Sequence, residues 1–444
     1  MNDILRFSSE IGTTSMNDTR PTNLHRPSRR RFINQSLFLL SSLALPQFAR
    51  GESPPATATG LTQAPREAAQ TFADPAWVRD AIRLMWAERK RSGVTPLLHL
   101  SPPFSKDLHL YLKHEAKSPT GSLKHRVAWG LVMGALVNGA IGPRTHLFEA
   151  TSGNTAIGEA YFAAKLGLPF TAVMRPGISE LKIQAIKQYG SQVAIAPPGT
   201  SPGVYLEQLR QAEAEGYNLN QFANTEKVLD YFDADPDRNM NLAAEVYRQL
   251  AMEDLPCPDW FVAGAGSGGT ATSIARYLRK WADFDGRNCP ARLAVVDPED
   301  SVLFDWYLTG NDTLSIPSGS RIEGIGSSGP VVFGKTFSLL REGIAQMIKV
   351  PDSASLAGMQ LVTELVGFEV GPSTGTNFYG ALRLMERMHR EGRGGTLVAI
   401  ICDEGSRYRD KYYNPEWIAQ AGLKPDPWKV SLSEFWATGR WQAV

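Results

Sequence analysis

The chain has 444 residues, enough for two domains and a substantial core; 43% of them are hydrophobic and 20% are charged. The formal net charge of +1 gives no reason to expect a nucleic acid or an anionic membrane as a partner. Only three cysteines occur, without a CxxC pair or a His/Cys cluster of zinc spacing, so no metal site is predicted.

The first 50 residues predict a signal peptide. Ser28-Arg29-Arg30-Arg31-Phe32-Ile33 resembles the twin-arginine export motif, and the apolar segment 36–45 is too short to span a bilayer, which needs about 20 apolar residues. We therefore expect the twin-arginine export machinery as a partner, a periplasmic location and no stable membrane anchor. A disordered basic tail on a cytoplasmic protein is the alternative.

Residues 51–75 are rich in Ala, Thr and Pro and predict a linker, after which residues 75–91 carry apolar side chains at helical spacing. From residue 108 onward short apolar runs alternate with amphipathic stretches, which is typical of parallel sheets with helices on both faces. Strands are predicted at 108–112, 145–148, 170–174, 192–196, 260–263, 293–296 and 396–401. Helices are predicted between them at 155–166, 179–189, 204–215, 240–252, 270–280 and 377–390.

The segment from Lys117 to Arg126 reads Lys-Ser-Pro-Thr-Gly-Ser-Leu-Lys-His-Arg and places Lys124 just before an apolar run, 127–137, that predicts a helix. A lysine held there, partly desolvated near other groups, is suited to supply a neutral amine for Schiff-base chemistry. Taken alone, the segment also fits a solvent-facing lysine in the first turn of an ordinary helix.

Two further segments suit an anion. Residues 148–155, Phe-Glu-Ala-Thr-Ser-Gly-Asn-Thr, run from a predicted strand into a predicted helix, although Ser152 or Asn154 also fits a simple helix cap. The loop Gly264-Ala-Gly-Ser-Gly-Gly-Thr270 lies between a strand and a helix, where glycines let the backbone approach a phosphate. The loop also contains a GxGxxG, and Asp297 ends the next strand, which is the pattern of a dinucleotide site.

Together these motifs resemble those of pyridoxal phosphate (PLP) enzymes of the cysteine synthase and cystathionine β-synthase family. Ser118, Leu123 and His125 stand where that family has Asn, Phe and Asp in Asn-Pro-Thr-Gly-Ser-Phe-Lys-Asp-Arg. The loop at 151–155 is similar to the family's Thr-Ser-Gly-Asn-Thr-Gly, with Ala156 for the last Gly. Residues 371–375 are similar to Gly-x-Ser-Ser-Gly. The version around Lys124 is most similar to the L-cysteine desulfhydrase branch.

The resemblance implies a role for each matching residue. Lys124 is expected to bind PLP covalently and to act as the general base. Asn154 would bond the ring hydroxyl of the cofactor and Ser373 its pyridine nitrogen. The phosphate would be held by the glycine loop, namely Gly266, Ser267, Gly268, Gly269 and Thr270. The substrate carboxylate would be held by Thr151, Ser152, Thr155 and Gln221. For His125 we expect a packing or surface role.

The fold implied is PLP fold type II: an α/β chain of two domains with parallel-rich twisted sheets flanked by helices, and the cofactor in the cleft between them. We assign 76–126 and 241–407 to the large PLP-binding domain and 127–240 to the small one. The extension 408–444 carries no motif, and its aromatic residues are expected to cover the body or a dimer partner. A homodimer is expected.

The reaction implied is PLP-dependent β-elimination on L-cysteine, a small amino-acid substrate, with release of sulfide, pyruvate and ammonia. β-Replacement of the cysteine synthase or cystathionine β-synthase type shares the first half of this reaction and stays open. An NAD-dependent oxidoreductase that uses the GxGxxG at Gly264 is the alternative from another class. A binding protein that kept the fold and lost activity is the third.

Overall fold

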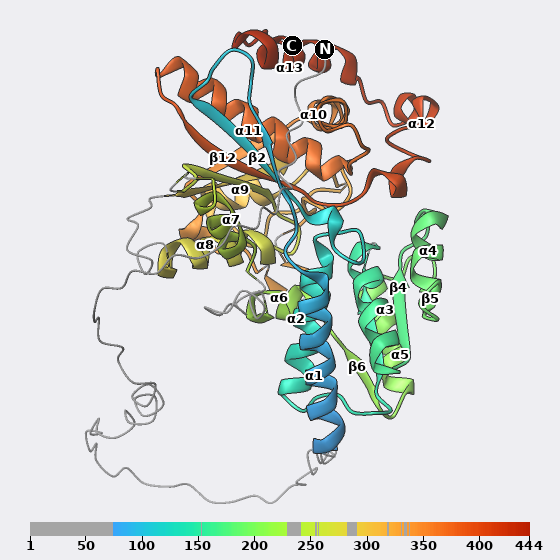
Figure 1. Ribbon diagram of the computed structural model, residues 1–444. Coiled ribbons are helices and arrows are strands. Elements are labelled where there is room, and N and C mark those ends of the chain that lie inside the picture. The colour runs from blue at the N-terminus through green and yellow to red at the C-terminus, as the bar shows by residue number, and fades with distance from the viewer. Residues whose placement is uncertain are drawn as a thin grey trace, which may run out of the picture. The chain divides into compact units, whose positions relative to one another are not determined.

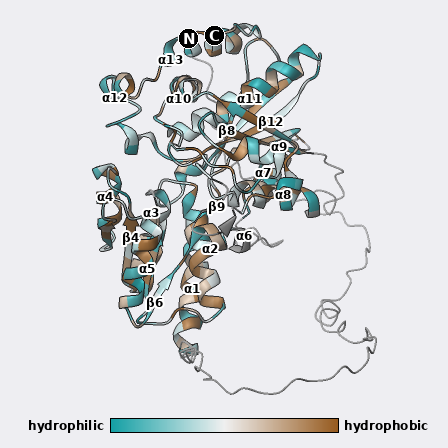
Figure 2. Cartoon of the chain, turned by 180° about the vertical axis from the view of Figure 1, so that it is seen from behind, coloured by the Kyte–Doolittle hydropathy of each residue, from teal (hydrophilic) through white to brown (hydrophobic). Residues whose placement is uncertain are grey.

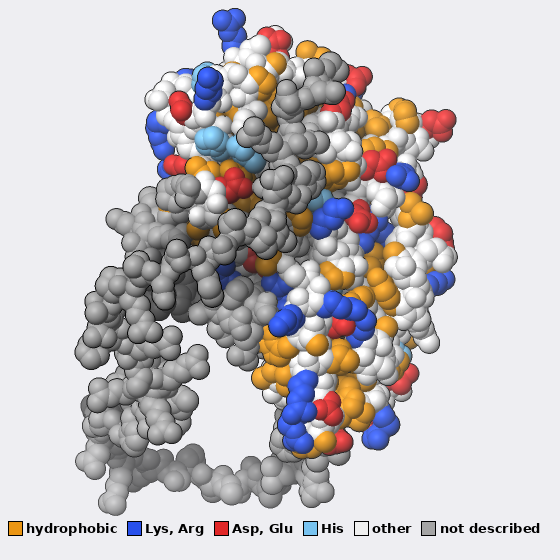
Figure 3. Space-filling model, in the orientation of Figure 1, with side chains coloured by type: hydrophobic (Ala, Val, Ile, Leu, Met, Phe, Trp, Pro, Cys, Tyr) orange, Lys and Arg blue, Asp and Glu red, His pale blue; other side chains and the backbone are white. Residues whose placement is uncertain are grey.

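The computed structural model describes residues 74–444 apart from 152, 229–240, 254, 256, 282–290, 318, 330, 333–334 and 337. The predicted signal peptide, the predicted linker except its last two residues, and Ser152 therefore lie outside the described residues. Within the described part, no helix has the length and apolar character needed to cross a membrane. On the face seen in Figure 3, basic and acidic side chains are interspersed.

A six-stranded sheet forms the larger half of the described chain (Figure 1). Its strands are parallel except for the antiparallel pair β1–β2. The last strand in the sequence, β12, lies in the interior of the sheet between β2 and β7. In spatial order the strands are β1 (Leu97–Leu100), β2 (Leu108–His114), β12 (Gly395–Ile401), β7 (Trp260–Gly264), β8 (Arg292–Pro298) and β11 (Gln346–Val350).

Helices cover both faces of this sheet because successive strand residues point to opposite sides. Val262 and Ala399 face one hydrophobic core, and their neighbours Phe261 and Val398 face the other. The first core is closed by α10 (Asp352–Val366), α11 (Pro372–Arg390) and α13 (Pro425–Thr438), with α12 (Pro415–Gln420) at its border. The second core is closed by α7 (Leu242–Ala251), α8 (Gly269–Trp281) and α9 (Leu303–Thr309).

A parallel four-stranded sheet forms the smaller half, in the order β5 (Gln192–Ile195), β4 (Phe170–Met174), β3 (His146–Ala150) and β6 (Gly216–Asn218). One face packs against α1 (Pro75–Ser92), α2 (Lys124–Val137), α3 (Asn154–Leu166) and α4 (Glu180–Lys187). The other face packs against α5 (Pro202–Ala212). Helix α2 is apolar on nearly all sides, as its colour in Figure 2 shows, and is therefore buried.

Short elements complete the described chain: α6 (Gln221–Val228), a hairpin of β9 (Val331–Val332) with β10 (Lys335–Thr336), and 3₁₀ turns at Glu115–Lys117, Arg341–Gly343 and Gly405–Tyr408. All seven predicted strands exist, and so do the predicted helices. The elements that were not predicted are strands β1, β6, β9, β10 and β11 and helices α6, α9, α10, α12 and α13. Helix α11 begins one turn earlier than expected, at Pro372, so that Ser373 lies in its first turn.

The two sheets divide the chain much as the predicted domains do, with one difference at the N-terminus. Helix α1 packs against α2 and α3, where Trp129 Nε1 donates to Met85 O at 2.9 Å, although residues 76–126 were assigned to the larger domain. Strand β2, in the same range, does belong to the larger sheet. The boundary at residue 240 falls outside the described residues, and the domain limits stay a prediction.

The C-terminal extension covers the body of the larger half. Leu432 and Phe435 of α13 are fully buried in the core that α10 and α11 share. Tyr413 accepts a hydrogen bond from Val370 N at 2.9 Å and donates one to Val370 O at 2.7 Å. The extension is therefore part of the folded unit.

Candidate active site

A cavity of about 640 Å³ lies between the two sheet-bearing halves, within the range of small-molecule sites. Its walls come from the start of α2, the β3–α3 junction, the β7–α8 loop and the segment 319–328. Every predicted site residue lines it except Ser152, which is outside the described residues: Lys124, Thr151, Asn154, Thr155, Gln221, Gly266, Ser267, Gly268, Gly269, Thr270 and Ser373.

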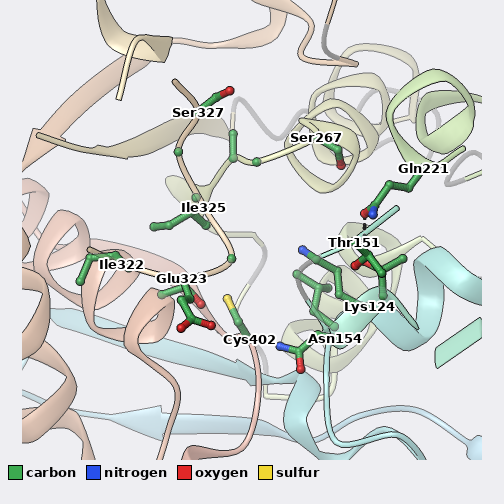
Figure 4. Close-up of a pocket in the computed structure, with 18 of the residues that line it drawn as sticks. Lys124, Thr151, Asn154, Gln221, Ser267, Ile322, Glu323, Ile325, Ser327 and Cys402 are labelled. Carbon is green, nitrogen blue, oxygen red and sulfur yellow. Dashed lines mark hydrogen bonds between the residues drawn. The ribbon is translucent and has the colours of Figure 1, made fainter. Parts of the chain in front are cut away.

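Lys124 is the first residue of α2 and follows a tight turn. Ser118 Oγ both donates to Ser122 O at 2.7 Å and accepts from Ser122 N at 3.0 Å, and Gly121 supplies the left-handed φ of +66° that the turn needs. Leu123 N donates to Cys402 O at 2.7 Å, which fixes this turn to the end of β12. Figure 4 shows the Lys124 side chain directed into the cavity between Cys402 and Thr151.

The two residues after Lys124 turn away from the cavity. His125 is buried against the rings of Tyr161 and Phe162, and desolvation, with the charge of Arg126, lowers its pKa to about 3. His125 is therefore neutral and has a packing role. The guanidinium of Arg126 is buried between two carboxylates, with contacts of 2.7 Å to Glu115 and 2.7 Å to Glu245.

The β3–α3 junction brings the predicted carboxylate-binding residues together. Thr155 Oγ1 donates to Gln221 Oε1 at 2.9 Å, and Gln221 Nε2 donates to Ala150 O at 3.3 Å. Gly153, at φ +140°, allows the sharp turn in front of α3. Thr151 lies on the same wall (Figure 4). These side chains surround the N-terminus of α3, which attracts a carboxylate.

Asn154 is held from the other half of the molecule. Its amide nitrogen lies 2.5 Å from Asp403 Oδ2 and 3.2 Å from Tyr408 Oη, and its oxygen accepts from Arg407 Nη1 at 2.6 Å. Tyr408 Oη donates to the same carboxylate oxygen of Asp403 at 2.5 Å. Sequence reasoning missed these partners, because they follow β12 without any motif.

The glycine loop fits a phosphate. The backbone N–H groups of Ser267, Gly268, Gly269 and Thr270 have no hydrogen-bond acceptor among the described residues, and α8 begins at Gly269. Such a group of unpaired donors at the start of a helix binds an anion. Gly268 has φ +84°, and a Cβ there would lie 2.5 Å from Leu339 N, so the loop requires glycine at this position for its own packing.

Ser373 lies at the bottom of the cavity beside Cys402. The Cys402 thiol accepts from Asn377 Nδ2 at 3.2 Å and donates to Ile400 O at 3.7 Å. Desolvation raises the pKa of Cys402 to about 12, so the sulfur remains a protonated thiol. The ring nitrogen of a cofactor placed here would meet neutral groups. A neutral partner does not favour protonation of that nitrogen.

A charged group at the cavity wall was not predicted. Glu323 forms an ion pair with Lys182 of α4 and another, at 2.7 Å, with Lys411 of the C-terminal extension. Lys182 also lies 4.7 Å from the centre of the Tyr408 ring. Tyr412 accepts a hydrogen bond from Glu323 N at 3.0 Å. The two halves are thus connected beside the cavity by side chains whose positions in the sequence give no hint of it.

Asp297 does not serve the dinucleotide alternative. Its side chain is fully buried and accepts a hydrogen bond from Phe304 N at 2.8 Å in the first turn of α9. Desolvation raises its pKa to about 7. A carboxylate that binds a ribose must be accessible at the end of its strand. Asp297 instead caps a helix, and this removes the second feature on which the oxidoreductase hypothesis depended.

Comparison with known proteins agrees with this geometry. The profile of the family described as "Pyridoxal-phosphate dependent enzyme" matches residues 89–403. L-cysteine desulfhydrase Cds1 of Mycobacterium tuberculosis is 42% identical over 370 residues, which cover 82% of this chain and 96% of that protein. N-(2-amino-2-carboxyethyl)-L-glutamate synthase of Ralstonia nicotianae is 31% identical over 337 residues, covering 74% and 89%.

Among solved structures, the O-acetylserine-dependent cystathionine β-synthase of Helicobacter pylori superposes with a TM-score of 0.60. It is 26% identical in sequence, and the match covers 73% of this chain and 97% of that one. The predicted fold class, PLP fold type II, is confirmed, and the oxidoreductase hypothesis is wrong. With the family profile matching residues 89–403 and Lys124 and the glycine loop around one cavity, this chain belongs to the family of pyridoxal-phosphate-dependent enzymes.

Proposed function

We propose that this enzyme catalyses β-elimination on L-cysteine: L-cysteine and water give sulfide, pyruvate and ammonia. The observation that carries the proposal is the convergence of Lys124, the carboxylate-binding wall and the donor loop on one cavity. The 42% identity to an L-cysteine desulfhydrase over most of both chains supports the same substrate.

Each wall of the cavity has a task in this reaction. We assign the phosphate of PLP to the N–H groups of residues 267–270 and the ring nitrogen to Ser373. Bound PLP supplies the electron sink that stabilises negative charge on the substrate Cα. Asn154, held by Asp403 and Arg407, is suited to keep the ring in one orientation. We assign no role to the Cys402 thiol beyond its contact with Ser373.

Proton transfer falls to Lys124. We assign the substrate carboxylate to Thr151, Thr155 and Gln221 at the start of α3, where the hydroxyls, the amide and the helix N-terminus attract an anion. Lys124 points into the same cavity (Figure 4), and we assign its amine the role of the general base that takes the α-proton of a substrate anchored there. The same lysine, then protonated, is assigned as the acid for the departing sulfur.

β-Replacement is the second candidate function. The relatives that support it are the two synthases, at 31% and 26% identity. Both reactions use the same first half, so the assigned residues serve either one. The two differ in whether a second nucleophile or water completes the reaction.

The test supplies the purified enzyme with L-cysteine and measures sulfide, pyruvate and ammonia together. O-acetyl-L-serine with sulfide is supplied in parallel, and the specificity constants kcat/KM are compared. We expect the three products in equal amounts from L-cysteine. A hundredfold preference for O-acetyl-L-serine, about 2.7 kcal/mol in the transition state, assigns the chain to the synthases instead.

Export and assembly are proposed on sequence alone. The twin-arginine pattern before the apolar segment 36–45 supports transport of the folded, PLP-loaded enzyme to the periplasm. Changing Arg29 and Arg30 to Lys is expected to retain the enzyme in the cytoplasm, which cell fractionation checks. The homodimer is tested by light scattering of the purified protein.

A further inference from the structure

Two buried carboxyl groups lie directly behind the carboxylate-binding wall. Glu149 in β3 is 1% exposed and Glu159 in α3 is 0% exposed. The two carboxyls lie close enough for each to act on the pKa of the other. Neither oxygen of Glu159 receives a hydrogen bond from any donor among the described residues. One oxygen of Glu149 accepts from Gln221 N at 2.9 Å.

Among the described residues, no cation compensates this pair. The titratable side chains on α2, α3 and the strands β3 and β6 around it are Lys124, His125, Arg126, His146, Tyr161, Lys165 and Tyr217. None of them acts on the pair, whose electrostatics come from burial, from the two carboxyls themselves and from Gln221 and the backbone. Two carboxylates cannot both remain ionised in contact and without donors, because each raises the cost of the other's charge.

The pair also lies where it can influence substrate binding. Glu159 is one helical turn after Thr155 on α3, so both side chains are on the same side of that helix. Glu149 fixes the first residue of α6, Gln221, whose amide oxygen in turn holds the Thr155 hydroxyl. The chain of contacts thus runs from the carboxyl pair to two residues assigned to the substrate carboxylate.

We propose that Glu149 and Glu159 share one proton and that this bridged pair is the positioning element that fixes Gln221, and through it Thr155, in the substrate site. The positioning role rests on the proposed function, because that function assigns Gln221 and Thr155 to the substrate. The shared proton is independent of it. The proton lies on the oxygen of one carboxyl and is donated to the facing oxygen of the other, which leaves the second oxygen of Glu149 free to accept from Gln221 N.

The pH dependence of stability follows from the direction in which the two pKa values are shifted. Burial raises both pKa values above the ordinary 4.5 that applies in the unfolded chain, that of Glu149 to about 8, and the charge of Glu149 raises the pKa of Glu159 further. Between about pH 5 and pH 8 the folded protein therefore keeps a proton that the unfolded protein has released. Stability from this pair is complete below pH 4.5 and is lost as pH rises through 8.

The experiment compares unfolding by urea at pH 5, 6, 7 and 8 in the wild type, Glu159→Gln and the double variant Glu149→Gln/Glu159→Gln. The double variant has no shared proton. For each pH unit, the unfolding constant of the wild type should therefore increase by a further factor of about ten relative to that of the double variant. Equal slopes in the wild type and the double variant would overturn the shared proton. The measurement needs no catalysis and applies to any variant that folds.

The positioning role is tested on L-cysteine turnover with Glu149→Ala and Glu149→Gln. The alanine variant loses the acceptor for Gln221 N, and we expect KM to rise about tenfold with kcat changed less than twofold. Glutamine restores an acceptor oxygen and should restore KM. Equal KM in both variants and the wild type would remove the positioning role. A wild type that releases no sulfide refutes the proposed function instead, and leaves the unfolding result valid.

Discussion

Two groups of buried acidic residues lie near the start of α2. The free-energy cost of burying a carboxylate charge is avoided in a different way in each group. Glu115 and Glu245 are neutralised by three cations: Arg126 contacts both, while Arg89 and Lys113 contact Glu245 at 2.6 and 2.9 Å. Glu149 and Glu159 have no cation and must keep a proton. We call the first group the ionic cluster and the second the carboxyl pair.

The contrast shows that burial alone does not set the charge state of a carboxyl. Desolvation would raise the pKa of Glu245, but Arg126 and Lys113 hold it well below its ordinary value. In the carboxyl pair nothing opposes the desolvation of Glu159, and for Glu149 hydrogen bonds such as that from Gln221 N oppose it only in part. The ionic cluster therefore stabilises the fold above about pH 4.5 and loses this contribution as pH falls. The carboxyl pair shows the reverse dependence.

The largest effect is expected from the loss of Lys124, at the start of α2. Lys124→Ala should lower turnover by roughly 10³-fold or more, because general-base catalysis alone contributes 10²–10⁴. Borohydride reduction of the variant should trap no PLP on the protein. A trapped adduct on another lysine, with activity near that of the wild type, ends the assignment of Lys124.

Glu245→Gln breaks the ionic cluster. Three buried cations would then share the single carboxylate of Glu115, and removing one partner of a buried ion pair costs about 3–5 kcal/mol. Urea unfolding at pH 7 measures the loss. The variant should also lose less stability on acidification than the wild type, since the depressed pKa of Glu245 no longer contributes below pH 4.5. An unchanged urea midpoint would show that the cluster is energetically neutral.

Gly268→Ala tests whether PLP binding depends on the glycine loop, which lies outside both acidic groups. A Cβ at φ +84°, 2.5 Å from Leu339 N, should displace the donor loop at a cost of about 1–3 kcal/mol. PLP retained after dialysis, measured by absorbance, should fall, while the slope of stability with pH stays that of the wild type. Full PLP retention in a folded variant contradicts the phosphate assignment.

The smallest effect is expected at an exposed pair. Arg83 contacts Asp80 at 2.8 Å, but the two side chains are 75% and 73% exposed, so solvent and salt screen their attraction. Arg83→Ala should leave the urea midpoint and turnover unchanged. A clear shift would mean that exposed charges matter as much as the buried ones, which would weaken the comparison between the two acidic groups.

The sequence predicted the site better than its surroundings. The lysine turn, the β3–α3 junction and the glycine loop are local patterns, so each was recognisable from a few consecutive residues. The ionic cluster was not, because Arg126 and Glu245 are 119 positions apart and a lone Glu in a helix normally faces solvent. Glu159 gave no signal for the same reason.

Two other failures have physical causes. Helix α10 is a long apolar stretch, which does not show the one-sided pattern that identifies a surface helix. The roles of Glu323 and Tyr412 depend on contacts between the two halves and the C-terminal extension, where no motif marks either partner. In both cases the information lies in tertiary packing and not in local spacing.

The interior position of β12 has a consequence for how this protein is made. The strand pairs with β2, nearly 300 positions earlier, and with β7, and it carries the backbone that fixes the Lys124 turn. Until residues 395–401 leave the ribosome, β2 and β7 have no partner between them, and pairings this distant in sequence form slowly. We therefore expect the Lys124 turn to be fixed only after β12 has been made. A chain interrupted shortly before β12 would keep the lysine, carboxylate and glycine motifs but would leave two open strand edges available for aggregation.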